Sequence, residues 1–412
     1  MKIYFLSPNL TGDGIKGHYC NYLKSIENCF SKNDNIEMII VSSIEASDSL
    51  ISNFRRILRH FLVYDSSFLN KQNSQFQRIV NSIRLYKDLV RLRKVLGKET
   101  RNDILFCDTI SDSEILGWLL FVVFNYSWIN YRFKNLVFIL RFRPIKNSIL
   151  LTTYVMVLEF LLFRFFIKIF KLNVLLFTDS ELLKNDYKKL LGINIDLLPI
   201  PIEKVHFNLL KSGYSEVECF NVLFIGGSQP HKGFDFMVLF LDKYFSLPMF
   251  RRDVIFNIQI DLNNKYEVSR VNPKILKLFN NLKERYNYQI KIIDSRIANE
   301  DYYKLFQNSN FVFLPYSSSH FKSATSNIFT ESVFFQVIPV VPNRTWMSYE
   351  LQTNDFEESI VDLNDLDKSY EVFSNLINNY SYILECFNEK MKKFREFNCS
   401  DNFHNTIISY FK

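Results

Sequence analysis

The sequence predicts an α/β protein made of two Rossmann-like, doubly wound domains in tandem, facing each other across a cleft. Its apolar runs do not alternate with polar residues, which is typical of parallel strands covered on both faces. A strand, a glycine loop and a helix follow one another near the start of each half. The proline-containing stretch 197–203 (LLPIPIE) separates the halves, and 412 residues suffice for two domains.

The first predicted domain covers residues 1–200. Its first strand leads through the glycine loop into a helix from about Tyr19, and helical segments are expected from the second strand to about Leu96. A further helix follows the last strand and is closed by Gly192. The predicted strands are 2–8, 36–43, 103–109, 135–142 and 174–180.

The second predicted domain covers residues 201–399, and the tail from about 400 to 412 is expected to pack back on the first. Helices are predicted at 300–309 and 370–397. The predicted strands are 221–227, 254–261, 289–295, 310–316 and 336–342. Ligands of open parallel sheets bind beyond the carboxyl ends of the strands, so the cleft between the domains is the expected site.

Composition indicates a folded protein, with 48% hydrophobic and 23% charged residues. The net charge of +7 is modest, but basic residues concentrate in 54–61 and 78–101. These stretches either meet phosphates, anionic lipid or nucleic acid, or form solvated helix faces. The six cysteines lack metal-ligand spacing.

Two apolar stretches raise the question of a membrane. Residues 114–129 are too short to span a bilayer, and 148–170 carry Glu159, Arg164 and Lys168. Both are interpreted as buried or interfacial helices, which leaves a peripheral contact with an anionic membrane open. Residues 1–9 predict a strand and no signal peptide, so the expected location is the cytoplasm, with the inner face of the cytoplasmic membrane as its refinement.

Two constellations of residues follow predicted strands of the second half. The first is GGSQPHKG (226–233), which holds three of the ten glycines and offers Gly226, Gly227, Ser228, Gln229 and Lys232 to a phosphate. Its spacing differs from a Walker A loop and from G-x-G-x-x-G. The alternative is a tight turn with an exposed lysine.

The second constellation lies in 311–351, where a hydroxyl-rich loop leads into a helix. Ser326 and Asn327 are good N-cap residues, so free N–H groups there, with Ile328, are candidates to hold a phosphate. Glu331 is a candidate acceptor for sugar hydroxyls. The alternative is a capped helix with an ordinary first-turn glutamate.

Together the two constellations resemble the donor-binding half of GT-B glycosyltransferases of family 4, the retaining nucleotide-sugar enzymes. Lys232 matches the lysine that binds the donor diphosphate in that family, and Gln229 stands at the arginine position. Glu331 matches the ribose-binding glutamate, while Ser323 replaces the first of the two glutamates. Thr325-Ser326-Asn327 and Thr345-Trp346 resemble the pattern of a subset of the family.

The first half resembles the family more weakly. GDGIKGH (12–18) resembles its first glycine loop, which assigns Gly14, Gly17 and His18 to the acceptor side. Asp108 and Asp112 stand near the position of a family histidine and either orient the acceptor or cap a helix. Arg141 and Arg143 either reach a phosphate or are exposed strand-end charges.

The resemblance implies a retaining, metal-independent glycosyltransferase with no cofactor and a nucleotide-sugar donor as substrate. Lys232, Glu331 and Asp108 are the catalytic candidates, and the acceptor is a sugar or a lipid-linked sugar, as in bacterial cell-surface polysaccharide or glycolipid synthesis. A GT-B epimerase and a catalytically silent sugar-nucleotide-binding or scaffold protein are the alternatives; a phosphorylase is disfavoured because no cofactor-lysine motif is evident. A nucleic-acid partner is not expected, because the basic stretches lack an aromatic-basic motif.

Overall fold

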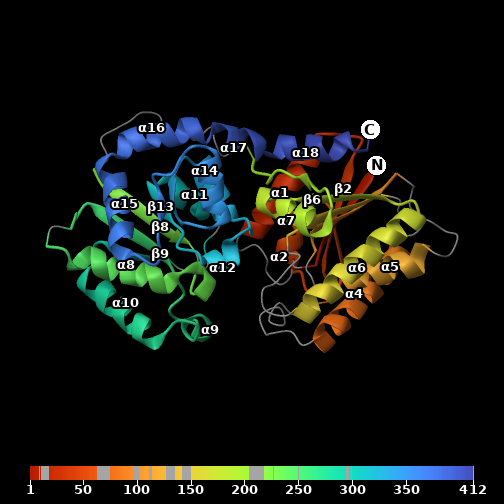
Figure 1. Cartoon of the computed structure of the whole chain (residues 1–412), viewed down its shortest axis with the longest axis horizontal. Helices are drawn as coiled ribbons and strands as arrows, with labels where there is room; N and C mark the ends of the chain where they lie inside the picture. Colours follow the sequence, from red (N-terminus) through yellow and green to blue (C-terminus); the bar gives the residue numbers. More distant parts are fainter. Residues whose placement is uncertain are drawn as a thin grey trace. The chain divides into compact units, whose positions relative to one another are not determined.

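The computed structural model describes residues 1–8, 10, 18–62, 75–96, 102–110, 114–126, 135–141, 150–203, 218–225, 227–248, 250–293, 297 and 299–411. The chain forms two compact units, drawn in Figure 1. The first consists mainly of residues up to Pro199 together with Phe403–Lys412, and the second of Ile200–Asn402. The divisions fall between Pro199 and Ile200 and between Asn402 and Phe403.

The first unit is built on a parallel sheet of seven strands in the order β3-β2-β1-β4-β5-β6-β7. Strands 1 to 6 therefore follow the doubly wound order, which reverses between β1 and β4. The strands are β1 (Lys2–Ser7), β2 (Glu37–Ser43), β3 (Ile57–Phe61), β4 (Ile104–Ile110), β5 (Asn135–Leu140), β6 (Asn173–Thr178) and β7 (Asp196–Leu197).

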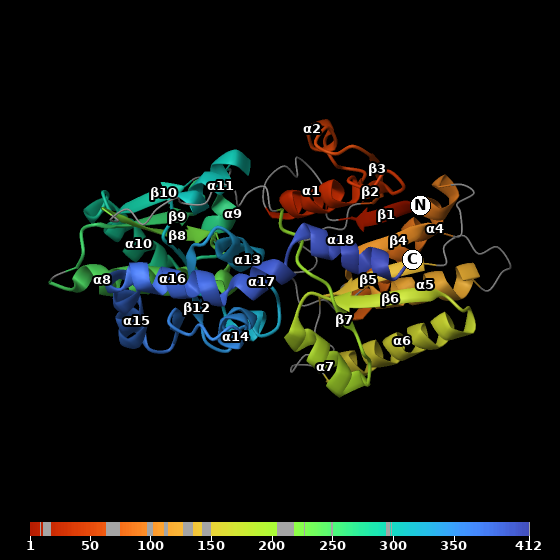
Figure 2. The ribbon, with the colours of Figure 1, turned by 90° about the horizontal axis from the view of Figure 1, so that it is seen from above.

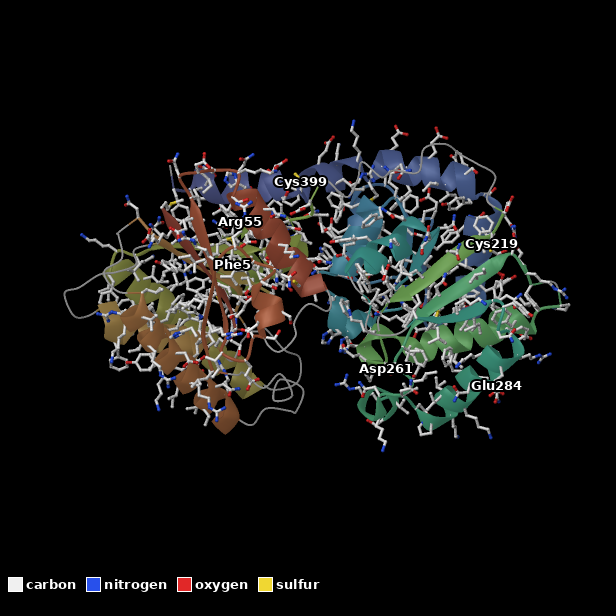
Figure 3. The ribbon with its side chains drawn as sticks, turned by 180° about the vertical axis from the view of Figure 1, so that it is seen from behind. Phe5, Arg55, Cys219, Asp261, Glu284 and Cys399 are labelled. Carbon is white, nitrogen blue, oxygen red and sulfur yellow. The ribbon has the colours of Figure 1, made fainter. Side chains whose placement is uncertain are left out.

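Helices cover both faces of this sheet (Figures 1 and 2). The core on one face joins α1 (His18–Phe30) and α18 (Ser400–Ser409) to the strands, with Phe403 and Ile407 fully buried. The core on the other face joins α4 (Gln75–Val95), α5 (Ile115–Tyr126) and α6 (Leu150–Ile169). The remaining described helices are α2 (Asp48–Ile51) and α7 (Glu181–Leu191). Phe5 of β1, labelled in Figure 3, lies in the core beneath α1 and α18. Its ring stacks on that of Phe106 in β4 at a centroid distance of 4.7 Å.

The second unit repeats the same strand order in a parallel sheet of six strands, β10-β9-β8-β11-β12-β13. The order reverses between β8 and β11, which places the expected ligand site beyond the carboxyl ends of those two strands. The strands are β8 (Phe220–Ile225), β9 (Val254–Gln259), β10 (Ile290–Ile293), β11 (Phe311–Phe313), β12 (Ile338–Pro342) and β13 (Ile360–Val361).

The helices of the second unit follow its strands in turn. They are α8 (Phe234–Ser246), α9 (Lys265–Val268), α10 (Pro273–Arg285), α11 (Asn299–Gln307), α12 (Ser318–Phe321), α13 (Asn327–Phe334), α14 (Trp346–Thr353), α15 (Leu366–Asn378), α16 (Tyr380–Lys390) and α17 (Lys392–Phe397). A short 3₁₀ helix, η2 (Pro230–Lys232), precedes α8. In the described ranges, no helix combines the length and apolar character that crossing a membrane would require.

The predicted fold class, two doubly wound parallel α/β domains, is confirmed, and every predicted strand is present. Three short strands were not predicted: β3, β7 and β13. Helical segments expected up to about Leu96 are present as α2 and α4, but Ile57–Phe61, between them, pairs with β2 as an edge strand that was not expected. The predicted helix 370–397 is three shorter helices, α15 to α17.

Candidate active site

The glycine loop follows β8 at the point where the strand order of the second sheet reverses. Gly227 has a φ of 62°, Ser228 is buried, and the main-chain N–H of Lys232 donates to the carbonyl of Gln229 at 2.8 Å. Gly233, at a φ of 75°, is then the N-cap of α8. The predicted strand–loop–helix is thus present, with a 3₁₀ turn inserted ahead of the α-helix. The side chain of Gln229 is exposed and caps no helix.

The loop after β11 holds this glycine loop in place. A Cβ at Gly233 would lie 1.8 Å from the carbonyl oxygen of Pro315, so only glycine permits this approach. The N–H of Ser317 donates to the carbonyl of His231 at 2.9 Å, and the hydroxyl of Tyr316 donates to the carbonyl of Ile225 at 3.3 Å. The two loops lie at the switch point of the sheet, where the strand order reverses. These contacts join them into one surface.

Lys232 is the last residue of η2, in the first of these two loops. Its ammonium is 4.1 Å from the ring centroid of Tyr316 and 4.8 Å from that of Phe321. No ion pair found among the described residues includes Lys232. Burial lowers its pKa from 10.5 to about 8. A cation held over aromatic rings without a carboxylate is suited to an anionic ligand.

Polar groups beside Lys232 add neutral donors. The imidazole of His231 stacks on that of His320 at a centroid distance of 4.4 Å. Burial, with His320 and Lys232 nearby, lowers the pKa of His231 to about 4, so this ring is neutral at neutral pH. The buried hydroxyl of Ser228 has no hydrogen-bond partner in the part of the chain that the structure describes. Such a hydroxyl can donate to a bound group.

The second sequence constellation meets the first through Tyr316. The Tyr316 hydroxyl also interacts with the side chain of Ser326, the N-cap of α13, which accepts a hydrogen bond from the N–H of Phe329 at 3.3 Å. Asn327 and Ile328 form the first turn of that helix. The structure thus brings Lys232 and the start of α13 into one connected set of contacts.

Glu331 is buried in α13 and accepts a hydrogen bond from the hydroxyl of Tyr302, in α11, at 2.6 Å. Burial and the neighbouring Glu331 raise the pKa of Tyr302, so this hydroxyl keeps its proton and donates. A carboxylate has four lone-pair sites on two oxygens, so it can accept further hydrogen bonds while Tyr302 fixes its orientation.

Three other residues named from the sequence have local structural roles. Ser323 is buried between α12 and α13. Thr345 is the N-cap of α14 and forms a capping box with Ser348. The ring of Trp346 packs edge-on against Phe329 at a centroid distance of 5.4 Å.

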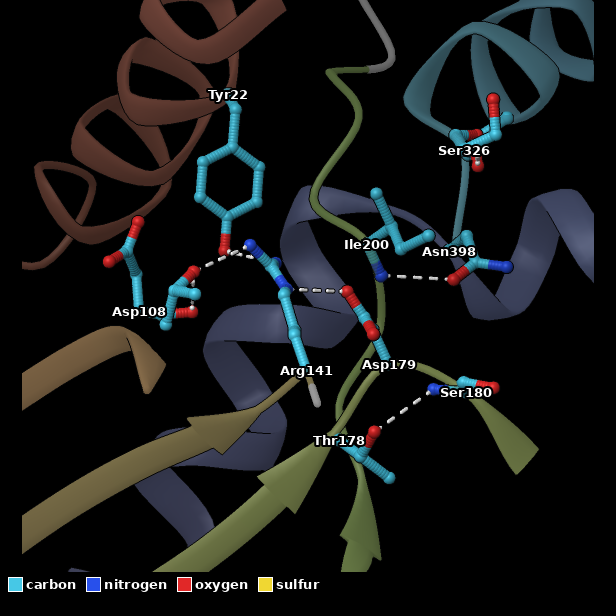
Figure 4. Close-up of polar contacts among 11 residues, drawn as sticks. Tyr22, Asp108, Arg141, Thr178, Asp179, Ser180, Ile200, Ser326 and Asn398 are labelled. Carbon is cyan, nitrogen blue, oxygen red and sulfur yellow. Dashed lines mark hydrogen bonds and ion pairs between the residues drawn. The ribbon is translucent and has the colours of Figure 1, made fainter. Parts of the chain in front are cut away.

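A buried charged cluster lies at the carboxyl ends of β4, β5 and β6 in the first unit (Figure 4). The guanidinium of Arg141 donates from Nε to Asp179 at 2.8 Å, from Nη1 to Thr109 at 3.2 Å and from Nη2 to the Tyr22 hydroxyl at 3.1 Å. Burial raises the pKa of Tyr22, so its hydroxyl stays protonated.

The cluster argues against the structural alternatives for Asp108 and Arg141, a helix cap and an exposed strand-end charge. The side chain of Arg141 is only 26% exposed and donates to Asp179, Thr109 and Tyr22, so it is no exposed strand-end charge. Asp108 is buried within β4, well before α5 begins, so it does not cap that helix. Its charge acts on both Arg141 and Tyr22.

Some predicted residues lie outside the described residues: Gly14, Gly17, Asp112, Arg143 and Gly226. His18 is the first residue of α1, and its side chain is likewise outside the description. In the described ranges, no group of three or more His, Cys, Asp or Glu could hold a metal ion.

Sequence reasoning missed the partners of these groups. They are Tyr22, Thr109 and Asp179 in the first unit, and Tyr302, Tyr316, His320 and Phe321 in the second. The position of Thr109 and Asp179 at strand ends is a signal that could have found them. An aromatic residue in a loop gives no comparable signal.

Comparison with known proteins finds similarity in structure but not in sequence. No protein-family model matches the sequence, and no curated protein matches it. Solved structures do match over the whole length. The structure described as trehalose-6-phosphate from E. coli bound with UDP-2-fluoro glucose has a TM-score of 0.67 at 11% identity, with 100% of this chain and 99% of that chain covered. The chain has the GT-B fold.

Two further GT-B structures agree. A glycosyltransferase from Rickettsia africae matches with a TM-score of 0.65 at 12% identity. The match covers 100% of this chain and 97% of the Rickettsia chain. The sucrose-phosphate synthase of Thermosynechococcus elongatus has a TM-score of 0.64 at 9% identity and covers 99% and 98% respectively. At such identities the likeness concerns the fold, so activity has to be argued from the site.

Proposed function

We propose that this GT-B protein is a retaining, metal-independent glycosyltransferase that moves a sugar from a nucleotide-sugar donor to an acceptor hydroxyl. The observation that carries the proposal is Lys232, a cation at the switch point of the second sheet that rests on two aromatic rings and has no acidic partner among the described residues. The nucleotide-sugar analogue in the E. coli GT-B structure supports the same class of donor.

Lys232 is assigned to the donor diphosphate. The leaving group of this reaction is a nucleoside diphosphate, on which negative charge develops as the bond to the sugar breaks. The ammonium of Lys232, the Ser228 hydroxyl and the loop N–H groups stabilise that charge, and the N-terminus of α13 adds its positive dipole. This arrangement assigns charge stabilisation to the protein, without a divalent ion.

Glu331 is assigned to the ribose of the donor. Its carboxylate is fixed by Tyr302 and can accept from a ribose hydroxyl while keeping that bond. Asp108 and Arg141 are assigned to the acceptor, because they lie at the strand ends of the first sheet next to its own switch point. The acceptor is a sugar or a lipid-linked sugar of bacterial cell-surface polysaccharide or glycolipid, met at the inner face of the cytoplasmic membrane.

The donor can be found by a thermal-shift screen of nucleotides and of UDP-, GDP-, ADP- and TDP-sugars, since ligand binding raises the apparent stability of the native state. With the donor known, Lys232→Ala loses most turnover and keeps its melting temperature, and EDTA leaves the wild-type rate unchanged. Lys274→Ala, in an exposed lysine of α10, is the matched control.

An unchanged rate of Lys232→Ala would refute the assignment of Lys232, and a loss of rate in EDTA would refute metal independence. Product analysis decides retention, because an inverted anomeric centre contradicts it. Binding of a nucleotide sugar without turnover of any donor would favour a silent binding protein instead.

A further inference from the structure

The helices α4, α5 and α6 have an outer surface that the core does not use. Their inner sides pack on the first sheet, and α5 contacts both α4 and α6 (Figures 1 and 2). On α6, Leu158 and Phe165 are 58% and 56% exposed. The exposed apolar residues of that helix recur every three or four positions and so form one stripe: Val155, Leu158, Leu161, Leu162, Phe165 and Ile169.

The neighbouring helices extend this apolar stripe. Phe124 near the end of α5 is 58% exposed, and Ile79 and Ile83 are exposed in the first turns of α4. A soluble protein seldom leaves so many large apolar side chains together on one layer without a partner. The surface therefore indicates an interaction site.

The exposed charges on the described part of these three helices are basic. The basic residues Arg84, Lys87 and Lys94 of α4 are exposed, as are Lys168 of α6 and Lys171 just beyond it. The three described helices contain two acidic residues, Asp88 and Glu159, and both are buried. Glu159 pairs with Arg78 across α6 and α4, and Asp88 pairs with Arg91. The two acidic residues are thus paired with Arg78 and Arg91. The exposed surface that remains is apolar, with basic side chains beside it.

We propose that this surface, formed by α4, α5 and α6, docks on an anionic lipid bilayer. An apolar stripe beside basic side chains matches the acyl boundary and the charged headgroups of such a membrane. Symmetric association with a second copy would bring the basic surfaces of both chains together, which is unfavourable. The contact is peripheral, because the inner sides of the helices are occupied by the core. The inference gives the membrane contact of the proposed function a defined surface, but it does not depend on glycosyl transfer.

Co-flotation of the full-length protein with vesicles tests the surface. We expect binding to vesicles of phosphatidylglycerol and phosphatidylcholine, weaker binding to phosphatidylcholine alone, and loss of binding at high salt. Each basic residue near an anionic surface contributes about fivefold in affinity. Arg84→Glu with Lys87→Glu should therefore weaken binding at least about tenfold. Lys274→Glu with Lys277→Glu, the same charge change on α10, should weaken it far less.

The apolar stripe is tested separately with Leu158→Glu and Phe165→Glu. We expect both to weaken vesicle binding, while Leu239→Glu, at an exposed position of α8, leaves it unchanged. Because substitutions can disturb folding, Phe165→Trp gives a second measurement. The chain has three tryptophans of its own, so quenching by brominated lipid is compared with that of wild type. It should be greater in Phe165→Trp and unchanged in Leu239→Trp.

Equal binding by Leu158→Glu and wild type, or quenching of Phe165→Trp that does not exceed that of wild type, would overturn the proposal. A dimer in sedimentation that the same substitutions dissociate would also overturn it, by assigning the surface to a second copy. Nucleotide thermal shifts of Leu158→Glu should equal those of wild type, so failure of the surface and failure of the proposed donor site are distinguishable.

Discussion

At the scale of single residues, Lys232 has an environment that is unusual for a lysine, buried against two aromatic rings. Its pKa of about 8 in the folded chain is below the ordinary value of 10.5, because burial disfavours the charged form. Folding is therefore opposed by this charge at neutral pH, and the opposition disappears as pH rises from about 8 to above 10.5. A ligand anion reverses this preference by stabilising the ammonium.

The first prediction concerns the pH dependence of nucleotide binding. Binding of a nucleoside diphosphate raises the pKa of Lys232, so protons are taken up on binding above pH 8. Affinity should be level just below this pH and fall by up to about tenfold per pH unit above it. Calorimetric titrations across this range measure it. In Lys232→Arg the fall should vanish, since arginine keeps its charge; a pH profile equal to that of wild type would contradict the role of Lys232.

Tyr302 supplies the second prediction. Tyr302→Phe removes the hydrogen bond that orients Glu331, and the unfolding free energy should fall by about 1–3 kcal/mol because a buried carboxylate loses a donor. If the Glu331 carboxylate accepts a hydrogen bond from a ribose hydroxyl, Tyr302→Phe should also change binding. The preference for a ribonucleotide over its dideoxy analogue should become smaller. Tyr303→Phe, on the next residue of α11, is the control. An unaltered preference would show that Tyr302 has a structural role alone.

At the scale of elements, the two loops at the switch point depend on Gly233. Gly233→Ala combines a positive φ with a Cβ 1.8 Å from a backbone oxygen, so one loop has to move. Gly192→Ala is a matched control, because its φ is 61° and nothing lies within 4 Å of the added carbon. The control should cost about 1–2 kcal/mol. Gly233→Ala should cost more in urea unfolding and also weaken nucleotide binding. Equal effects in both variants would contradict the close packing of the loops.

Sequence reasoning succeeded for elements with a continuous apolar run and failed where the run is broken. β1 and β8 are buried along nearly their whole length, so their sequences are almost wholly apolar. β3 contains Arg59 and His60, which an edge strand accepts because one side meets solvent. Its sequence therefore resembles a polar helix as much as a strand. β7 and β13 are two residues long and carry too few positions for any pattern.

Part of the candidate site could be predicted, namely those residues whose type and position in the sequence indicate a function. A lysine after a glycine loop and a glutamate after a capping serine can be found from their spacing. Tyr316 and Phe321 cannot, because an aromatic residue becomes a cation's neighbour only through the fold. Tyr22, Thr109 and Asp179 are far apart in sequence and meet around Arg141 only once the strands are paired.

At the scale of the whole molecule, the two units repeat one strand order, and the last helix completes the first core. Phe403 is fully buried and packs edge-on against Phe30 at a centroid distance of 6.2 Å. Phe403→Ala should lower the unfolding free energy by about 3–5 kcal/mol. Tyr382→Ala, at a site 71% exposed, should have little effect. Urea unfolding measures both, and an unfolding free energy of Phe403→Ala equal to that of wild type would contradict the assignment of this helix to the core.

The central claim is that the loop after β8 and the start of α13 hold a nucleoside diphosphate through Lys232. Calorimetric titration of wild type and Lys232→Met with UDP, GDP, ADP and TDP tests it most directly. The account predicts that wild type binds at least one of them, and that Lys232→Met loses most of this affinity with no loss of melting temperature. Equal affinity in both proteins, or no binding of any of the four by wild type, would contradict it.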